Sequence, residues 1–489
     1  MLGDIFCWNA TLKGDFDGLE KGSHNFLFVC HHWFEVASHT PEIWSFWGNT
    51  LKDWKQRYRR SGSAPLDLVL DGHEIVGSVI PYDALQDRAT RDTIRRIHLR
   101  TNNSWLLNSL LQQLTVPGEG VRSSNVTSFI LWNWDHLPVD VSNFFSRYQF
   151  PKLQRLHLQN YTISSWDCLM SQTTVLTTLN LRFADSSPTP SISQLLSIFA
   201  SNPALRKVNL GKGAIPGDGD KKTSFRVQLH HLKELMLEGD LQHVITLLHR
   251  LDHPRNMNLL GLTLHDCDVT DVSQIIGPYL RDHLQRCDRP QDGLYLSVFT
   301  GHLPGYRGNQ IMLQVGDPGG INFSARIWEH PDVFVAITVV SNAVLRTDIR
   351  KRVALELIAH TPREEVVYLH TADNPVAMED AYTQFPNLRA LSSSVTPLSE
   401  LFPNPNLVGD EKIFPSLEHI RLDCGFGDNS GWSPLIAFLD RLTSSGSRLD
   451  TLVISSTAHM CSEVVEGIRS MVREFVIDQL NPLRNFDAY

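Results

Sequence analysis

Residues 153–158 read LQRLHL, and the same spacing of aliphatic residues returns at 176–181 (LTTLNL), 205–210 (LRKVNL) and 232–237 (LKELML). Side chains alternate between the two sides of an extended strand, so the fourth and sixth residues of each stretch share one side. The motif therefore predicts a short strand that points these two residues into a core. The first aliphatic residue would fill the turn that leads into the strand.

The six-residue motif recurs along most of the 489-residue chain. Its first positions are Ile94, Val126, Leu153, Leu176, Leu205, Leu232 and Leu259 and, after a gap, Leu388, Leu417 and Leu449. Successive first positions in the two runs lie 23 to 32 residues apart, which indicates a repeat array. The pattern resembles the leucine-rich repeat, mostly in its longer, helix-containing form. This resemblance implies an α/β fold, a leucine-rich-repeat solenoid in which a curved parallel sheet carries outer helices.

The residues between the motifs are expected to return over the outside as helices. In the stretch 191–201, Ile192, Leu195, Leu196 and Phe199 have the i, i+3, i+4, i+7 spacing of one helical face. A Phe-Pro pair precedes the motif at Phe150, Phe385 and Phe414, where proline would stop a helix. The alternative, a set of unrelated amphipathic strands, leaves these three pairs unexplained.

The repeat pattern divides the chain into five expected segments. They are a helical unit without repeats (1–50), a linker (51–90), repeats (91–272), irregular strand-rich repeats or an insertion (273–350), and repeats with a C-terminal cap helix (351–489). Glycines punctuate the irregular segment, whose expected strands are 294–298, 311–315, 321–323 and 333–337. Val464, Ile468, Met471, Phe475 and Val476 are expected to form one face of the cap helix, which would close the open core of the array.

The first fifty residues contain no repeat and many aromatic side chains. Two helices are expected around 2–6 (LGDIF) and 26–37, and Thr40-Pro41 would begin a third helix. The stretches 2–6, 29–33 (VCHHW) and 40–44 (TPEIW) resemble an F-box, and residues 54–70 resemble the linker of fungal F-box proteins with leucine-rich repeats. The usual Leu-Pro-x-Glu opening is missing, so the box is expected to be truncated at its N-terminus, and His31 replaces the usual Arg or Lys.

The F-box resemblance implies a substrate-recognition subunit of a cullin–RING (SCF-type) E3 ubiquitin ligase, a protein without catalytic residues or cofactors. The box would bind the Skp adaptor and, through it, cullin, while the repeats bind a substrate protein for ubiquitination. Carried over by position, the adaptor-binding or F-box core residues are Leu2, Ile5, Phe6, Val29, Cys30, Trp33 and Trp44. The alternative is a leucine-rich-repeat scaffold or sensor that no longer binds the adaptor.

Composition disfavours several other classes of protein. The net charge of −9 argues against nucleic acid as a partner, because chains that coat nucleic acid are normally basic. The seven cysteines are scattered and no secretory signal opens the chain, which favours a reducing compartment, cytoplasmic or nuclear. The most apolar run, Val333–Val340, is too short to span a membrane.

Motifs for catalysis or metal binding are weak. The stretch 211–223 resembles a phosphate-binding loop, but Asp220 interrupts the required Gly-Lys pair. Asp266, Asp268 and Asp271 lack the glycine and closing glutamate of a calcium loop. We expect no metal site, and an enzyme hidden within 273–350 is a third, weaker hypothesis.

The third, fifth and seventh motif positions are expected to face away from the core, onto the concave side of the array. In the early repeats they are basic, with one tryptophan that we expect to be exposed. The candidate substrate-binding residues are Arg96, Arg100, Trp132, Arg155, His157, Arg182 and Lys207. Arginines suit an acidic or phosphorylated segment of a substrate, because guanidinium groups bind carboxylates and phosphates through paired hydrogen bonds. The sign of the charge then changes at Glu234 and Glu238, which flank Met236.

Overall fold

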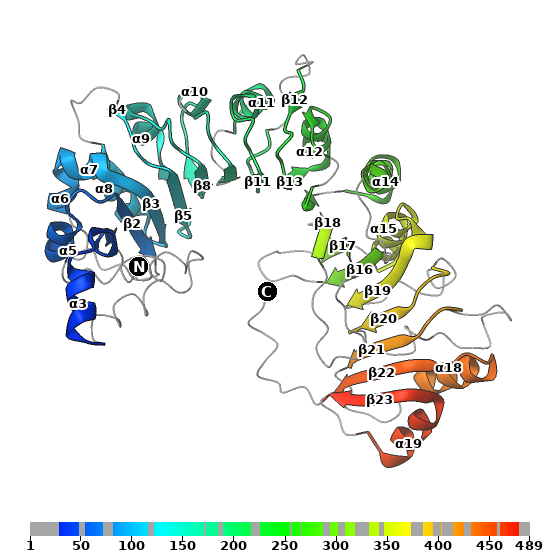
Figure 1. Ribbon diagram of the computed structural model, residues 1–489. Helices are drawn as coiled ribbons and strands as arrows, with labels where there is room; N and C mark the ends of the chain where they lie inside the picture. Colours follow the sequence, from blue (N-terminus) through cyan, green and yellow to red (C-terminus); the bar gives the residue numbers. More distant parts are fainter. Residues whose placement is uncertain are drawn as a thin grey trace. The chain divides into compact units, whose positions relative to one another are not determined.

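The chain is a mixed α/β protein with a large, mostly parallel β-sheet and accompanying helices (Figure 1). The computed structural model describes residues 29–47, 54–71, 82–115, 122–170, 173–183, 189–216, 225–254, 257–265, 267–286, 294–301, 309–317, 332–341, 347–372, 385–394, 402, 414–424, 432–456 and 460–478. The chain divides into two compact units, a first unit of Met1–Pro254 and a second unit of Arg255–Tyr489.

The main-sheet strands of the first unit pair in parallel in the order of the sequence. They are β1 (Phe46–Trp47), β2 (Leu66–Asp71), β3 (Ile94–Thr101), β5 (Ser128–Asn133), β8 (Arg155–Gln159), β10 (Thr178–Arg182), β11 (Lys207–Leu210) and β13 (Glu234–Asp240). The sixth residues of the motif pair with one another from strand to strand, and all are buried: Leu99, Leu131, Leu158, Leu181, Leu210 and Leu237. Leu156 and Leu179, at the fourth position, are each 1% exposed. The predicted direction of the motif side chains is confirmed.

Helices lie along one side of this sheet in Figure 1: α8 (Ser104–Leu114), α9 (Ser142–Arg147), α10 (Asp167–Met170), α11 (Ile192–Ser201) and α12 (Leu241–Leu248). The predicted face of α11 is buried, and a capping box between Ser191 and Gln194 begins the helix. Asn202 ends it and is fully buried, where it accepts a hydrogen bond from the Leu176 N–H at 3.0 Å. The helix end is thereby joined to the turn that leads into the preceding strand, β10.

Part of the expected linker is a strand. Residues 66–71 form β2, and Leu66, Leu68 and Leu70 are buried in the core beside β3. Three helices accompany it in this region, α5 (Trp54–Ser61), α6 (Tyr82–Gln86) and α7 (Arg88–Thr93). These residues of the expected linker form a strand because their leucines alternate, although the first position of the motif is missing.

The N-terminal part that the structure describes begins with α3 (His31–Ser38) and α4 (Pro41–Trp44). Pro41 stands in the first turn of α4, as predicted. Thr40 does not cap this helix, because its hydroxyl donates to the Val36 carbonyl oxygen at 2.7 Å instead.

The sheet of the second unit contains an antiparallel insertion. Its strands lie in the order β15 (Leu259–His265), β18 (Asp332–Ser341), β17 (Asn309–Asp317), β16 (Leu294–Gly301), β19 (Val366–Ala372), β20 (Ala390–Ser393), β21 (His419–Cys424), β22 (Leu449–Ser456) and β23 (Val472–Asp478). Only β17 runs against its neighbours among these strands.

The irregular segment is therefore a three-stranded meander between two parallel stretches. Three of its four expected strands are present, and the fourth, at 321–323, lies outside the described residues. Helices α13 (Val269–Asp271), η3 (Val272–Ile276) and α14 (Gly277–Arg286) precede the meander, and α15 (Thr347–Ala359) follows it.

The second unit also corrects the prediction of a cap helix. Helix α18 (Ser433–Ser444) precedes β22, and α19 (Ser462–Met471) ends before Phe475. The next seven residues form β23, which pairs in parallel with β22. β-Branched and aromatic residues are concentrated at 472–477, and this composition favours a strand over a longer helix.

Candidate functional site

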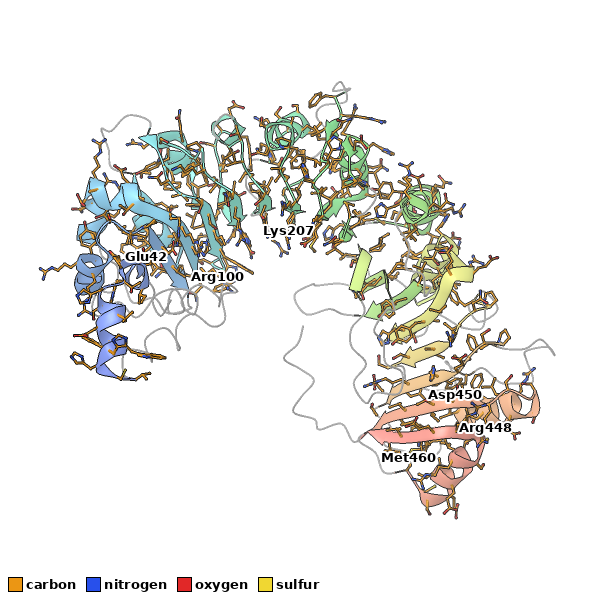
Figure 2. The ribbon with its side chains drawn as sticks, in the orientation of Figure 1. Glu42, Arg100, Lys207, Arg448, Asp450 and Met460 are labelled. Atoms are coloured by element: carbon orange, nitrogen blue, oxygen red, sulfur yellow. The ribbon has the colours of Figure 1, made fainter. Side chains whose placement is uncertain are left out.

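The candidate site is the face of the first unit's sheet that lies opposite the motif leucines, and we call it the strand face. Strand pairing arranges its residues in three rows. They are Arg96, Ser128, Arg155, Thr178, Lys207 and Glu234; His98, Ile130, His157, Asn180, Asn209 and Met236; and Arg100, Trp132, Gln159 and Arg182. All seven predicted substrate-binding residues belong to these rows. Figure 2 shows Arg100 and Lys207 on the side of the first unit away from its helices.

Trp132 is not the exposed anchor that we expected. The Arg100 guanidinium lies over its ring, 4.6 Å from the centroid, and the His157 and Trp134 rings lie 5.3 and 5.8 Å away. The side chain is half-buried, and its buried indole N–H has no hydrogen-bond partner in the part of the chain that the structure describes. These contacts form because Trp132 and Arg100 occupy neighbouring positions on paired strands.

Two histidines lie in the middle row, and both are neutral at pH 7. Burial lowers the pKa of His98 to about 4, together with the charges of Arg96 and Arg155 and that of His157 once it is protonated. Burial and the charge of Arg100 lower the pKa of His157 to about 4. The His98 Nε2 atom lies 2.8 Å from the Ser128 hydroxyl, and the His157 Nδ1 atom lies 3.5 Å from the Asn180 amide nitrogen. The charged groups that act on both imidazoles are cations.

The arginines near these histidines have few carboxylate partners. Arg95 and Arg96 share one carboxylate, Asp67, at 2.8 and 3.7 Å. Arg155 is exposed and has no carboxylate partner within the described ranges. The strand face is therefore positively charged over β3, β5 and β8.

The other end of the strand face is balanced in charge. The Lys207 Nζ atom lies 2.6 Å from the Glu234 carboxylate, and the Arg182 guanidinium lies 3.8 Å from Glu238. Met236 stands between the two glutamates in the sequence and is 43% exposed. The motif gave the direction of Arg182 and Lys207 correctly, but their ion pairs depend on which residues of neighbouring strands lie side by side.

The F-box-like residues that the structure describes make a small apolar cluster. Ala37, Ile43 and Trp44 are buried, and Trp33 and Val36 pack against them. The Trp44 indole N–H donates to the Ala37 carbonyl oxygen at 2.7 Å, and the Arg60 guanidinium lies 4.3 Å from a Trp44 ring centroid. Trp33 and Trp44 thus serve as core residues.

Other F-box-like positions face solvent. Val29 is 58% exposed, Cys30 is exposed, and Phe34, which the sequence analysis did not single out, is 42% exposed. Leu2, Ile5 and Phe6 lie outside the described residues. The exposure of Phe34 could have been inferred from its neighbour Trp33, because consecutive helical residues point in different directions.

Within the described residues, no group of three or more potential metal ligands occurs, and no helix is long and apolar enough to span a membrane. Cys30, Cys267 and Cys461 are free thiols. No protein-family model matches the chain, and comparison with curated proteins gives no significant match.

Proposed function

We propose that the chain is the substrate-recognition subunit of a cullin–RING ubiquitin ligase, a leucine-rich-repeat solenoid preceded by an F-box. The repeats would bind a substrate protein, and the box would bind the Skp adaptor. The observation that carries the proposal is the strand face, on which charged and polar side chains of successive parallel strands form continuous rows opposite a leucine core. Such a surface suits binding of a protein segment.

The proposed mechanism is proximity, with no bond made or broken by this chain. A receptor that holds a substrate beside the ubiquitin-carrying enzyme raises the effective concentration of the substrate's lysines there. It also restricts their orientation, which lowers the entropic cost of reaching the transition state.

Exposed apolar side chains on α3 and just before it support the adaptor role. Val29 and Phe34 are exposed, whereas the neighbouring Trp44 is buried in the small core. Exposed large apolar side chains beside a formed core favour a protein contact. The F-box resemblance names the Skp adaptor as that contact.

A second candidate function is a scaffold that does not bind the adaptor. The Arg60 guanidinium of α5 lies over both Trp44 and Phe34, at 4.3 and 5.9 Å from the ring centroids. These contacts join the box-like helices to the rest of the first unit, and they would persist in a relic that has lost its adaptor.

Charged substitutions on α3 and just before it distinguish the two candidates. We expect the double variant Val29→Asp, Phe34→Asp to lose co-precipitation with purified Skp adaptor at least tenfold, because it places two carboxylates in an apolar contact. The matched control is His32→Asp, which adds a carboxylate at another exposed position of the same helix and should bind like wild type. Failure of the wild-type chain to bind the adaptor would favour the scaffold.

A further inference from the structure

Positive charge on the strand face is confined to one end. Over β3, β5 and β8, Arg96 shares the carboxylate of Asp67 with Arg95, which lies outside the three rows, and Arg155 has no carboxylate partner in the described ranges. At β10, β11 and β13, Lys207 and Arg182 each have a glutamate partner. The β3–β8 end of this face therefore carries more positive charge that no carboxylate neutralises than the β10–β13 end does.

The excess positive charge is spread over an area larger than one anionic group. Arg96 and Arg155 flank Ser128 in the same row, two strand spacings or about 10 Å apart. Arg100 lies on the other side of the two histidines, four residues along β3 from Arg96, where it is aligned with Asp71 of β2 and adds less to the excess than Arg155 does. Several carboxylates along one peptide match this distribution better than a single phosphoryl group. Burial is the main cause of the low pKa values of His98 and His157, and neighbouring arginine charges lower these values further.

The middle row continues from this basic area to an apolar side chain. Asn180 and Asn209, which are both half-buried, follow His157 on the next two strands. Their amides can donate to and accept from a peptide backbone. The row ends at the exposed Met236, whose flexible thioether adapts to varied apolar partners.

The spacing of the strands sets the spacing of the ligand. Four strand steps separate β5 from β13, which is about 19 Å at ~4.8 Å per step. An extended peptide advances ~3.3 Å per residue, so about six residues cover this distance. Figure 2 shows Arg100 and Lys207 on the same side of the first unit, which leaves one continuous face for such a peptide.

We infer that the strand face binds one extended peptide that crosses the strands, with consecutive Asp or Glu residues over β3–β8 and an apolar residue, about six positions away, on Met236. This inference deepens the proposed function by naming the class of substrate segment. Nucleic acid fits the path less well, because Glu234 and Glu238 would repel phosphodiesters at its far end.

A labelled peptide and the full chain test the inference by fluorescence anisotropy. The peptide contains three glutamates, four Ala/Ser residues and a leucine, and it is made in both chain directions. We expect the peptide to bind in one of the two chain directions. Its affinity should fall at least fivefold when the glutamates become glutamines, when leucine becomes serine, or when the Ala/Ser linker is shortened to one residue. A single phosphoserine in place of the glutamates should bind more weakly.

Matched variants assign the two ends of the peptide. Arg155→Gln should weaken binding about fivefold, a loss typical of one partly exposed charge pair, whereas Lys207→Gln, which removes a cation already paired with Glu234, should change it less than twofold. Met236→Ser should weaken binding of the leucine peptide as much as the leucine-to-serine change in the peptide does. Combining the two changes should cause no further loss of affinity, because both remove the same contact. Val175→Ser, at an exposed apolar residue outside the three rows, is the control for folding and general hydrophobicity.

Several results would overturn the inference: equal effects of Arg155→Gln and Lys207→Gln, binding that ignores linker length, tighter binding of the phosphoserine peptide, or tighter binding of a 12-nucleotide single strand. Adaptor binding is measured separately on the same preparations. Peptide binding without adaptor binding would refute the ligase role and leave the inference standing, and the reverse outcome would refute the inference alone.

Discussion

Replacement of Leu156 by aspartate is expected to unfold the first unit at room temperature. Leu156 is 1% exposed and pairs with Phe129 and Leu179 on the neighbouring strands, which are equally buried. Loss of a buried leucine side chain costs about 2–5 kcal/mol, and an unpaired buried carboxylate adds several more. The total approaches the ~5–15 kcal/mol that stabilises a whole domain.

Circular dichroism and limited proteolysis measure this effect, and the neighbouring residue provides the control. Arg155 precedes Leu156 on β8 but faces the opposite side and is exposed. Arg155→Asp introduces the same side chain and should change the free energy of unfolding by less than about 1 kcal/mol. Equal stability of the two variants would contradict the assignment of the strand's two faces.

Mild acid is expected to destabilise the first unit before most carboxylates titrate. The pKa values of His98 and His157 are about 4 in the folded chain against an ordinary 6.5, so the unfolded chain binds protons more strongly. Their contribution to stability is complete above pH 6.5 and is lost as the pH falls toward 4. Each histidine accounts for about 2 kcal/mol between pH 7.5 and pH 5.

Urea unfolding followed by tryptophan fluorescence at pH 7.5, 6 and 5 measures the loss. The variant His98→Gln, His157→Gln keeps polar side chains that do not titrate and should remove most of the pH dependence over this range. The charged groups acting on the two imidazoles are Arg96, Arg100 and Arg155, which do not titrate there, and His157, which acts on His98 and is itself replaced in the double variant. His360 and His419 also have lowered pKa values, but they belong to the second unit. A double variant with the wild-type pH dependence would contradict this explanation.

The periodic part of the fold could be predicted because its signal is local. The motif alone gives the strand positions at Leu156 and Leu179 and the direction of Arg155 and Lys207, since alternation along a strand fixes both faces. The strand at 66–71 was missed because its leucines lack the first position of the motif. At 472–478 helical spacing competed with β-branched composition, and pairing with β22 decides between them.

The features of the site that the sequence could not predict are contacts between side chains on different strands. Trp132 was expected to be exposed, but its ring lies beneath Arg100, a residue 32 positions earlier in the chain. The same limit applies to the ion pair of Lys207 with Glu234, which are 27 positions apart. Such pairs follow from register, and register requires the repeat lengths and loops to be known.

A three-step sensor experiment tests the central claim, that this chain joins a ligase adaptor to a substrate segment. Purified Skp adaptor is immobilised, the wild-type chain is added, and the glutamate–leucine peptide follows. We predict that the adaptor retains the chain and that the peptide binds only where the chain is present. Val29→Asp, Phe34→Asp should abolish the second step, and Arg155→Gln should weaken only the third. A wild-type chain that passes over the adaptor without being retained would contradict the claim.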